Sequence, residues 1–153
     1  MPPDRLPESV SWVLALGDSL RAAVSERELV HLIEAPVLLE VPRSPPYCRH
    51  VVAWNQLLLP AMDLSAWLLG RSPQNSRSLA GVFAYQARRG ADPDYGALLL
   101  ADIPTRIRVT DDLACGLPKN PPTWRSVAIS CFKQDKKAIP ILDLRHIFSG
   151  GLR

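Results

Sequence analysis

The side chains of this sequence that could perform chemistry are three thiols, three imidazoles and two carboxylates in matching contexts: Cys48, Cys115, Cys131, His31, His50, His146, Asp63 and Asp143. Thiolates and imidazoles bind zinc or act as nucleophile and base, and paired carboxylates act as general acid and base. The cysteines have no C-x-x-C spacing, and no two histidines lie four residues apart, as ligands on one helix face would. An odd number of cysteines also gives no disulfide framework and fits a reducing compartment. We therefore predict no metal, no cofactor and no catalytic residue.

Sequence motifs of common enzymes are missing as well. The chain has no G-x-S-x-G, no glycine-rich loop ending in Gly-Lys-Ser/Thr, no G-x-G-x-x-G and no H-E-x-x-H. Cys48 stands beside Arg49 and His50, a setting that favours a thiolate, but no third group or oxyanion motif accompanies it. A small hydrolase without a familiar motif stays open as an alternative, and it would need a perturbed acid or thiol in a deep pocket.

Asp63 and Asp143 occupy the same place in an internal repeat. Leu59–Gly70 (LPAMDLSAWLLG) and Ile139–Gly150 (IPILDLRHIFSG) share Pro, Asp, Leu and Gly in register. An Asp that follows an apolar strand can accept hydrogen bonds from the first N–H groups of a short helix, and Gly allows a left-handed exit. Each copy therefore predicts a strand and a capped helical turn, with the two Asp residues as structural caps. The proline inside each strand lacks an N–H, which predicts an edge or a bulge there.

Composition indicates a soluble globular protein: 47% of the residues are hydrophobic and 22% are charged. The N-terminus has no apolar signal core and no apolar run is long enough to cross a membrane, so we expect a cytoplasmic protein without membrane insertion. Charge is uneven, because residues 1–70 carry five basic and eight acidic side chains, whereas residues 71–153 carry thirteen and seven. The basic half could face an acidic protein or a nucleic acid, or it could be a solvated surface.

Short apolar segments separated by turn residues predict an all-β fold with short helices. Hairpin turns are expected at Gly17-Asp18, Asn55-Gln56 and residues 134–136, and residues 90–96 form a cluster of turn residues. A helix is expected at Leu64–Leu69 and a helical turn after a Thr110 cap. The expected strands are Trp12–Leu16, Leu20–Val24, Leu29–Ile33, Val37–Val41, Val51–Trp54, Leu57–Met62, Leu79–Gln86, Ala97–Ala101, Arg106–Val109, Val127–Phe132 and Ala138–Leu142. Many short strands indicate a sandwich or barrels, and the repeat favours two barrels.

The order of these elements resembles the CheW-like domain. Val51–Leu64 (VVAWNQLLLPAMDL) is similar to the family pattern G-V-x-N-L-R-G-x-x-[LIV]-P-[LIV]-[LIV]-D-L, and residues 127–144 look like the family's closing copy of Pro-x-x-Asp-Leu. The resemblance covers about residues 11–150 and leaves residues 1–10 as an N-terminal tail. It implies two intertwined five-stranded β-barrel subdomains, with the switch between halves near residues 70–78.

The resemblance also implies a function and partners. Members of this family are non-enzymatic adaptors that link the cytoplasmic tip of methyl-accepting chemoreceptors to a CheA-type histidine kinase, in the cytoplasm at membrane-associated receptor arrays. A groove between the subdomains contacts the receptor, and another edge docks on the regulatory domain of the kinase. Carried onto this sequence, the receptor-groove residues are Leu29, His31, His50, Trp54, Asn55 and Gln56.

The sequence departs from the family at the hairpin. The family's N-L-R-G is Ala53-Trp54-Asn55-Gln56 here, so Asn55 stands at the arginine position and lacks the charge and five-donor fork of a guanidinium. This departure suggests an accessory member, in a chemosensory system for chemotaxis or for type IV pili and twitching motility. Trp54 is either a partner-binding hot spot or a barrel core residue.

One further alternative is a nucleic-acid-binding β-barrel that uses its basic second half. Such a protein would bind with strong salt dependence and would stack bases on exposed aromatic rings. Few aromatic residues lie in the basic segments, so we expect no nucleic-acid partner.

Overall fold

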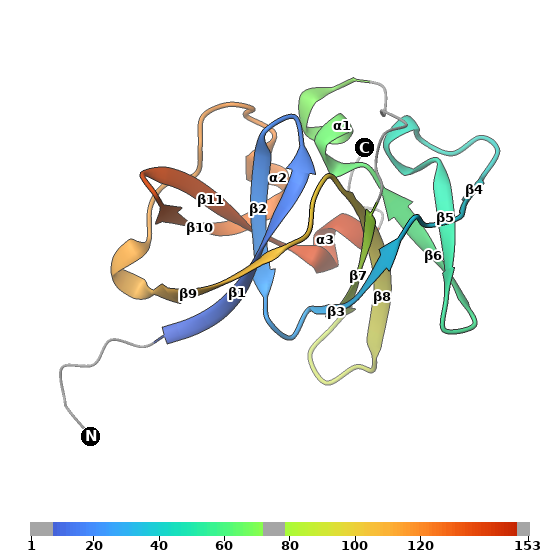
Figure 1. Cartoon of the computed structure of the whole chain (residues 1–153), viewed down its shortest axis with the longest axis horizontal. Helices are drawn as coiled ribbons and strands as arrows, with labels where there is room; N and C mark the ends of the chain where they lie inside the picture. Colours follow the sequence, from blue (N-terminus) through green and yellow to red (C-terminus); the bar gives the residue numbers. More distant parts are fainter. Residues whose placement is uncertain (1–7, 72–78, 150–153) are drawn as a thin grey trace.

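Two curled β-sheets pack against each other in the computed structural model, which describes residues 8–71 and 79–149 (Figure 1). The first sheet has the order β10-β11-β2-β1-β9 and contains β1 (Glu8–Gly17), β2 (Leu20–Ser25), β9 (Thr105–Thr110), β10 (Ala128–Gln134) and β11 (Lys137–Leu142). The second has the order β3-β7-β8-β6-β5-β4 and contains β3 (Leu29–Glu34), β4 (Leu38–Glu40), β5 (His50–Trp54), β6 (Leu57–Met62), β7 (Leu79–Gln86) and β8 (Pro93–Leu100). The predicted fold class, mainly β with short helices, is confirmed. The second sheet has six strands, one more than expected, because the short β4 adds to β5.

The two sheets are not successive halves of the chain. The chain leaves the first sheet after Ser25, builds the whole second sheet between residues 29 and 100, and returns to the first sheet at Thr105. The expected switch near residues 70–78 thus falls within the span of the second sheet, and residues 72–78 lie outside the described part. Of the expected tail at residues 1–10, residues 8–10 are part of β1, and residues 1–7 are not described.

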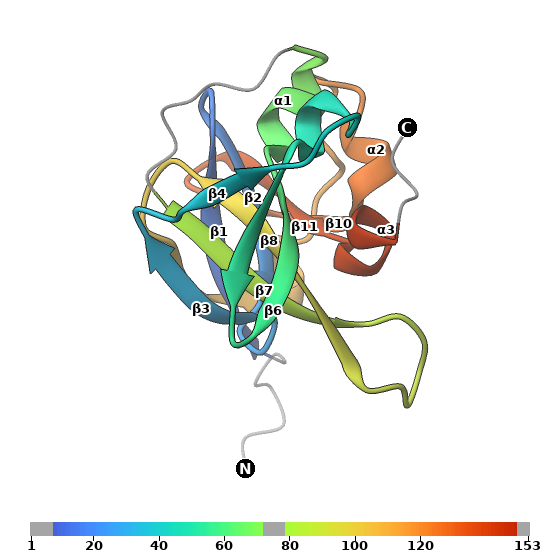
Figure 2. The same cartoon turned by 90° about the vertical axis from the view of Figure 1, so that its right-hand side faces the viewer.

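Short helices interlock the two sheets. Helix α1 (Leu64–Leu69) follows β6 of the second sheet but contacts β1 of the first, and α3 (Leu144–Phe148) follows β11 of the first sheet but contacts β7 of the second. Helix α2 (Trp124–Val127) contacts α3, and the 3₁₀ turns η1 (Pro46–Cys48) and η2 (Asp111–Leu113) lie in the connections before β5 and after β9. Because a helix that follows each sheet packs on a strand of the other sheet, the two sheets form one packed unit (Figures 1 and 2).

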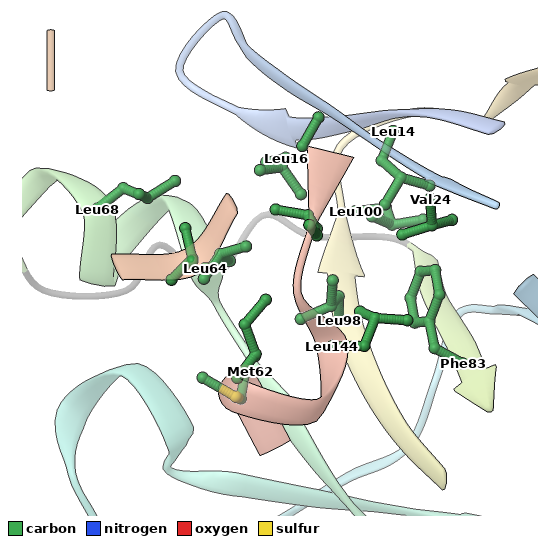
Figure 3. Close-up of a cluster of buried hydrophobic side chains, with 14 of the residues drawn as sticks. Leu14, Leu16, Val24, Met62, Leu64, Leu68, Phe83, Leu98, Leu100 and Leu144 are labelled. Atoms are coloured by element: carbon green, nitrogen blue, oxygen red, sulfur yellow. The ribbon is translucent and has the colours of Figure 1, made fainter. Parts of the chain in front are cut away.

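Strands at the junction are buried on both faces, which explains their continuous apolar sequences. In β8, Leu98 and Leu100 point into the core shared by both sheets, whereas Ala97 and Leu99 point into the core of the second sheet. In β1, Leu14 points into the shared core and Val13 into the core of the first sheet. Successive side chains of a strand point to opposite faces, so one strand serves two cores. Figure 3 shows the shared core, where Leu14 and Leu16 of the first sheet lie with Leu98, Leu100 and Phe83 of the second.

The internal repeat folds as predicted. The Oδ1 atom of Asp63 accepts a hydrogen bond from the N–H of Ala66 at 3.1 Å, and that of Asp143 accepts one from the N–H of His146 at 3.2 Å. Gly70 ends α1 in the left-handed conformation with φ 64°. The corresponding Gly150 lies outside the described residues.

The prolines of the repeat lie where each strand gains its second partner. Pro60 pairs with Val51 of β5, and the parallel ladder to β8 starts one residue later at Ala61. Pro140 pairs with Cys131 of β10, and the parallel contact with β2 comes one residue later at Ile141. Neither strand is at an edge of its sheet, but each proline stands just before the second ladder, where its missing N–H is not needed.

Three tight hairpin turns have positive φ at both central residues: Asp18-Ser19, Asn55-Gln56 and Asp135-Lys136. Such turns match the twist of the strands they connect. The first turn is one residue later than the dipeptide expected at Gly17-Asp18.

Three local expectations were wrong. Thr110 makes no side-chain cap to η2; its hydroxyl bonds instead to the carboxylate of Asp112. The turn cluster at residues 90–96 is shorter than expected, because β8 already starts at Pro93 and pairs with β7. The strand expected from Val127 begins at Ala128, and Val127 closes α2, a helix that the sequence did not reveal.

Candidate partner-binding surfaces

A groove of about 720 Å³ lies between the two sheets. Arg27 and Glu28 of the β2–β3 connection line it together with Tyr85 of β7 from the second sheet. Ile129 of β10 and residues 142–145 line it from the first. Ile129 is 67% exposed. The groove therefore combines apolar and aromatic residues of both sheets with charged residues from the β2–β3 connection and from the segment after β11.

Charges in the groove are mixed. Glu28 accepts a hydrogen bond from the N–H of Ser25 at 2.8 Å, and Arg145 donates one to the carbonyl oxygen of Gln86 at 3.0 Å. Burial raises the pKa of Glu28 above its usual range, and repulsion from Asp143 adds to the effect. Two arginines and two carboxylates at one site can recognise a polar partner of mixed charge.

The six residues predicted to contact the receptor are all in the second sheet or its turns, and five of them belong to β3 and to the turn end of the β5–β6 hairpin. The imidazole of His31 in β3 and the indole of Trp54 in β5 have ring centroids 6.3 Å apart. Asn55 and Gln56 form the turn after Trp54, and Leu29 is two residues before His31. His50 is at the other end of β5, about 13 Å along the strand at the usual rise per residue.

None of these six residues lines the groove between the sheets. Trp54 is half-buried, packs against the core of the second sheet and lies 5.1 Å from Tyr95 between ring centroids. Its packing against this core fits the expected core role, and its contact with a partner stays a prediction.

An exposed apolar face covers β4, β5 and β6. Leu39 pairs with Val51, Val51 pairs with Pro60, and Ala53 pairs with Leu58, which places these residues on one side of the sheet. The opposite side carries Val52 and Leu59 of the core. We call the outward set the β4–β6 apolar face; it consists of Leu39, Val51, Ala53, Leu58 and Pro60. Leu58 is 66% exposed and Leu39 49%, and sequence patterning missed the face because its residues resemble core residues.

The strands of the two sheets differ in the charged residues that they contain. The strands of the first sheet contain one acidic residue, Glu8, and five basic residues: Arg21, Arg106, Arg108, Lys133 and Lys137. The strands of the second sheet contain no lysine or arginine and three acidic residues: Glu34, Glu40 and Asp94. The strands of the first sheet are thus mainly basic, and those of the second are apolar to acidic.

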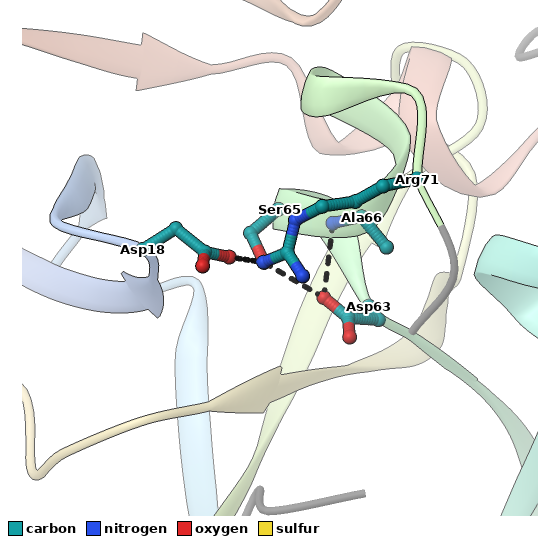
Figure 4. Close-up of polar contacts among 5 residues, drawn as sticks. All are labelled: Asp18, Asp63, Ser65, Ala66 and Arg71. Atoms are coloured by element: carbon teal, nitrogen blue, oxygen red, sulfur yellow. Dashed lines mark hydrogen bonds and ion pairs between the residues drawn. The ribbon is translucent and has the colours of Figure 1, made fainter. Parts of the chain in front are cut away.

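A polar cluster joins the first turn of the chain to α1 (Figure 4). Asp18 of the β1–β2 turn forms an ion pair with Arg71, just after α1. The hydroxyl of Ser65 lies 3.2 Å from Asp18 and 2.9 Å from Asp63, which links the ion pair to the cap of α1. Because the cluster holds the first sheet to the helix that leaves the second, it is a structural contact.

Reactive groups are few in the described residues. No group of three or more His, Cys, Asp and Glu side chains in residues 8–71 and 79–149 could hold a metal ion, and no helix in those ranges is long and apolar enough to cross a membrane. Cys115 and Cys131 lie side by side with 3.3 Å between sulfur atoms, a proximity that their sequence spacing did not reveal. All three cysteines are free thiols.

The arrangement defines a CheW-like fold: two interlocked curled sheets with a groove between them. No family model and no curated protein sequence matches the chain. Among solved structures, the chain is similar to the crystal structure of the scaffolding protein TtCheW from Thermoanaerobacter tengcongensis. The TM-score is 0.73 and the match covers 96% of this chain and 97% of that chain, at 14% sequence identity. The predicted CheW-like domain is therefore confirmed as a fold.

Proposed function

We propose that the chain is a non-enzymatic scaffold that couples chemoreceptors to a CheA-type histidine kinase. The observation that carries the proposal is the match in fold to a scaffolding protein over nearly the full length of both chains. The ordered motifs at Val51–Leu64 and residues 127–144 support it from the sequence. A scaffold needs docking surfaces, and the chain offers a groove and a separate apolar face.

The groove between the sheets is the proposed site for the receptor tip. Its lining includes Tyr85 and the exposed Ile129 together with the charged residues Arg27, Glu28 and Arg145. Apolar contacts supply affinity, and paired charges of both signs fix the register of a partner that carries complementary charges. A helical receptor tip with an apolar stripe between charged residues fits this chemistry.

The β4–β6 apolar face is the proposed site for the regulatory domain of the kinase. β4 is an edge strand of three residues, and the exposed leucines of the face are Leu39 in β4 itself and Leu58 in β6, two strands further into the sheet. Exposed edges and apolar patches are both typical of protein docking sites. The acidic residues Glu34 and Glu40 lie on the same sheet and favour a partner with basic residues around its own apolar patch.

A matched pair of variants tests both assignments. Ile129→Asp and Leu58→Asp replace residues of nearly equal exposure, 67% and 66%, so neither change should unfold the chain. We expect Ile129→Asp to weaken binding of a purified receptor-tip fragment at least tenfold and to leave kinase binding unchanged, with Leu58→Asp giving the reverse result; a tenfold loss corresponds to about 1.4 kcal/mol. Lys136→Ala, in the exposed β10–β11 turn, is the neutral control. Failure of the wild-type chain to bind either partner would end the scaffold proposal.

The hairpin at Asn55 offers a gain-of-function test. If the receptor also contacts this turn, Asn55→Arg restores the guanidinium of the family pattern and should strengthen receptor binding. Asn55 has φ 50°, a conformation that Asn tolerates better than Arg, so stability must be measured beside affinity. Unchanged affinity in a folded variant would exclude the turn from the contact.

Two further measurements separate the remaining alternatives. Binding of single-stranded DNA at increasing salt tests the basic first sheet, and tight salt-dependent binding without kinase binding would favour a nucleic-acid-binding barrel. Swimming and twitching assays of a deletion strain then assign the scaffold to chemotaxis or to control of type IV pili.

A further inference from the structure

We propose that Cys115 and Cys131 form a peroxide-sensitive dithiol that closes to a reversible disulfide within the folded protein. This role is separate from the scaffold function and does not depend on it. Their sulfur atoms lie 3.3 Å apart although the residues are 16 positions apart in the chain. Cys115 follows η2, and Cys131 is in β10 of the first sheet.

The backbone around the pair already has the geometry of neighbouring strands. The N–H of Cys115 donates a hydrogen bond to the carbonyl oxygen of Cys131 at 3.0 Å, and Ala114 pairs with Phe132 in an antiparallel bridge. Residues opposite each other in an antiparallel pair have Cα atoms about 4.5–5.5 Å apart, which lies within the range that a disulfide spans. Rotation of the two side chains therefore brings the sulfurs into bonding distance without movement of the strands.

The two thiols have unequal access. Cys115 is half-buried and can be reached from solvent, whereas Cys131 is 3% exposed. Burial and the neighbouring Cys115 raise the pKa of Cys131 to about 12, so its thiolate is scarce at neutral pH. Cys115 is thus the sulfur that meets the oxidant first, and Cys131 is the resolving thiol.

With hydrogen peroxide as oxidant, the reaction has two steps. The thiolate of Cys115 attacks one peroxide oxygen, the O–O bond breaks, and the hydroxide that leaves takes up the thiol proton to become water. Cys131 then attacks the sulfur of the resulting sulfenic acid, and the displaced hydroxide leaves as a second water with the proton of Cys131. Peroxide gains two electrons, the two sulfurs together lose two, and a small thiol reductant reverses the bond.

The disulfide would tie the connection after η2 to β10. That connection leads to α2, whose Trp124 is 2% exposed in the shared core, so the bond closes a loop around an anchored segment. We expect the oxidised protein to melt at a higher temperature than the reduced protein, because a cross-link restricts the unfolded chain.

Cys48 provides the internal control. It lies in η1 and packs against the shared core, and burial raises the pKa of its thiol as well. In Cys48→Ser only the proposed pair is left, and in Cys115→Ser the pair is broken at its more exposed member.

The experiment exposes the folded, reduced protein to a small excess of hydrogen peroxide, then unfolds it in denaturant with a maleimide that blocks every remaining thiol, buried ones included, for intact-mass analysis. We expect the wild type to fall from three labelled thiols to one, and Cys48→Ser to fall from two to none, both recovering with dithiothreitol. Peptide mapping of the wild type should find the segment of Cys115 joined to that of Cys131, a result that requires no variant to fold. Retention of all three thiols, cross-linking between molecules, or the same loss of thiols in Cys115→Ser would overturn the proposal.

Discussion

The two aspartate caps of the internal repeat should differ in their contribution to stability, and the difference follows from their surroundings. Asp63 is 2% exposed and accepts hydrogen bonds from the N–H of Ala66 and the hydroxyl of Ser65. Asp143 is half-buried and accepts one from the N–H of His146. Because both residues start a short helix at the same place in the repeat, Asp63→Ala and Asp143→Ala form a comparison within one molecule.

The expected magnitudes can be estimated from these contacts. Loss of a helix cap costs about 1 kcal/mol, which is the whole effect expected for Asp143→Ala. In Asp63→Ala the N–H of Ala66 loses its hydrogen-bond acceptor, and water cannot replace it because Ala66 is only 1% exposed. An unpaired buried donor adds about 1 kcal/mol or more to the loss of stability. The hydroxyl of Ser65 can still donate to Asp18 at 3.2 Å, so its lost bond to Asp63 adds little to the cost of the substitution. We expect a loss of about 2–3 kcal/mol for Asp63→Ala and about 1 kcal/mol for Asp143→Ala.

Equilibrium unfolding in urea measures the difference. A loss of about 2 kcal/mol moves the midpoint by roughly 1 M, since the slope for a small protein is about 1–3 kcal/mol per M. Asp63→Asn is the matched control, because its amide oxygen can still accept from Ala66. The Oδ2 atom of Asp63 has no hydrogen-bond partner among the described residues, so the amide nitrogen that replaces it removes no bond. Equal losses for the two Ala variants, or a loss in Asp63→Asn as large as in Asp63→Ala, would refute the capping argument.

Three further changes test other parts of the structure. Gly96→Ala places a methyl group 2.5 Å from the ring of Phe148, so we expect a loss of about 1–3 kcal/mol in urea unfolding, and an unchanged midpoint would contradict this packing. Burial and Asp143 raise the native pKa of Glu28 above 4.5, so its proton is held more tightly in the native state and stability falls as pH rises through that pKa. Glu28→Gln should therefore melt above the wild type at pH 7 and level with it at pH 4, whereas a lower melting temperature at pH 7 would speak against the assignment. Gln56→Gly removes a side chain at φ 64° and should stabilise the hairpin by about 0.5 kcal/mol, and a thermal melt that shows destabilisation would argue against the left-handed turn.

Local chemistry made much of the fold predictable. The Asp63 and Asp143 caps, the Asn55-Gln56 turn and the strands around them depend on interactions between residues close in sequence, and all are present. Helix α2 was missed because its four residues show no periodicity, and it is held by long-range contacts, such as the hydrogen bond from the hydroxyl of Thr123 to the carbonyl oxygen of Leu68 at 2.6 Å.

Candidate sites were harder to predict, because they combine residues distant in sequence. The groove joins Glu28 to Ile129 and Asp143, and the Cys115–Cys131 pair joins a connection to a strand. No short motif encodes such neighbours. The β4–β6 apolar face was hidden for a different reason: the apolar residues of β5 and β6 alternate between core and solvent, and composition alone does not distinguish the two sides.

The distribution of charge along the sequence differs from its distribution between the two sheets. Along the sequence, basic residues gather in the second half, which suggests one basic half-domain. In the structure, β9, β10 and β11 of that half join β1 and β2 from the start of the chain, whereas β7 and β8 complete the second sheet. The interlocked topology therefore places basic residues mainly on the strands of the first sheet and acidic residues mainly on those of the second. For the scaffold that we propose, the two docking sites are also unlike, because the groove carries charges of both signs and the β4–β6 face is apolar, so the two partners would not compete for one site.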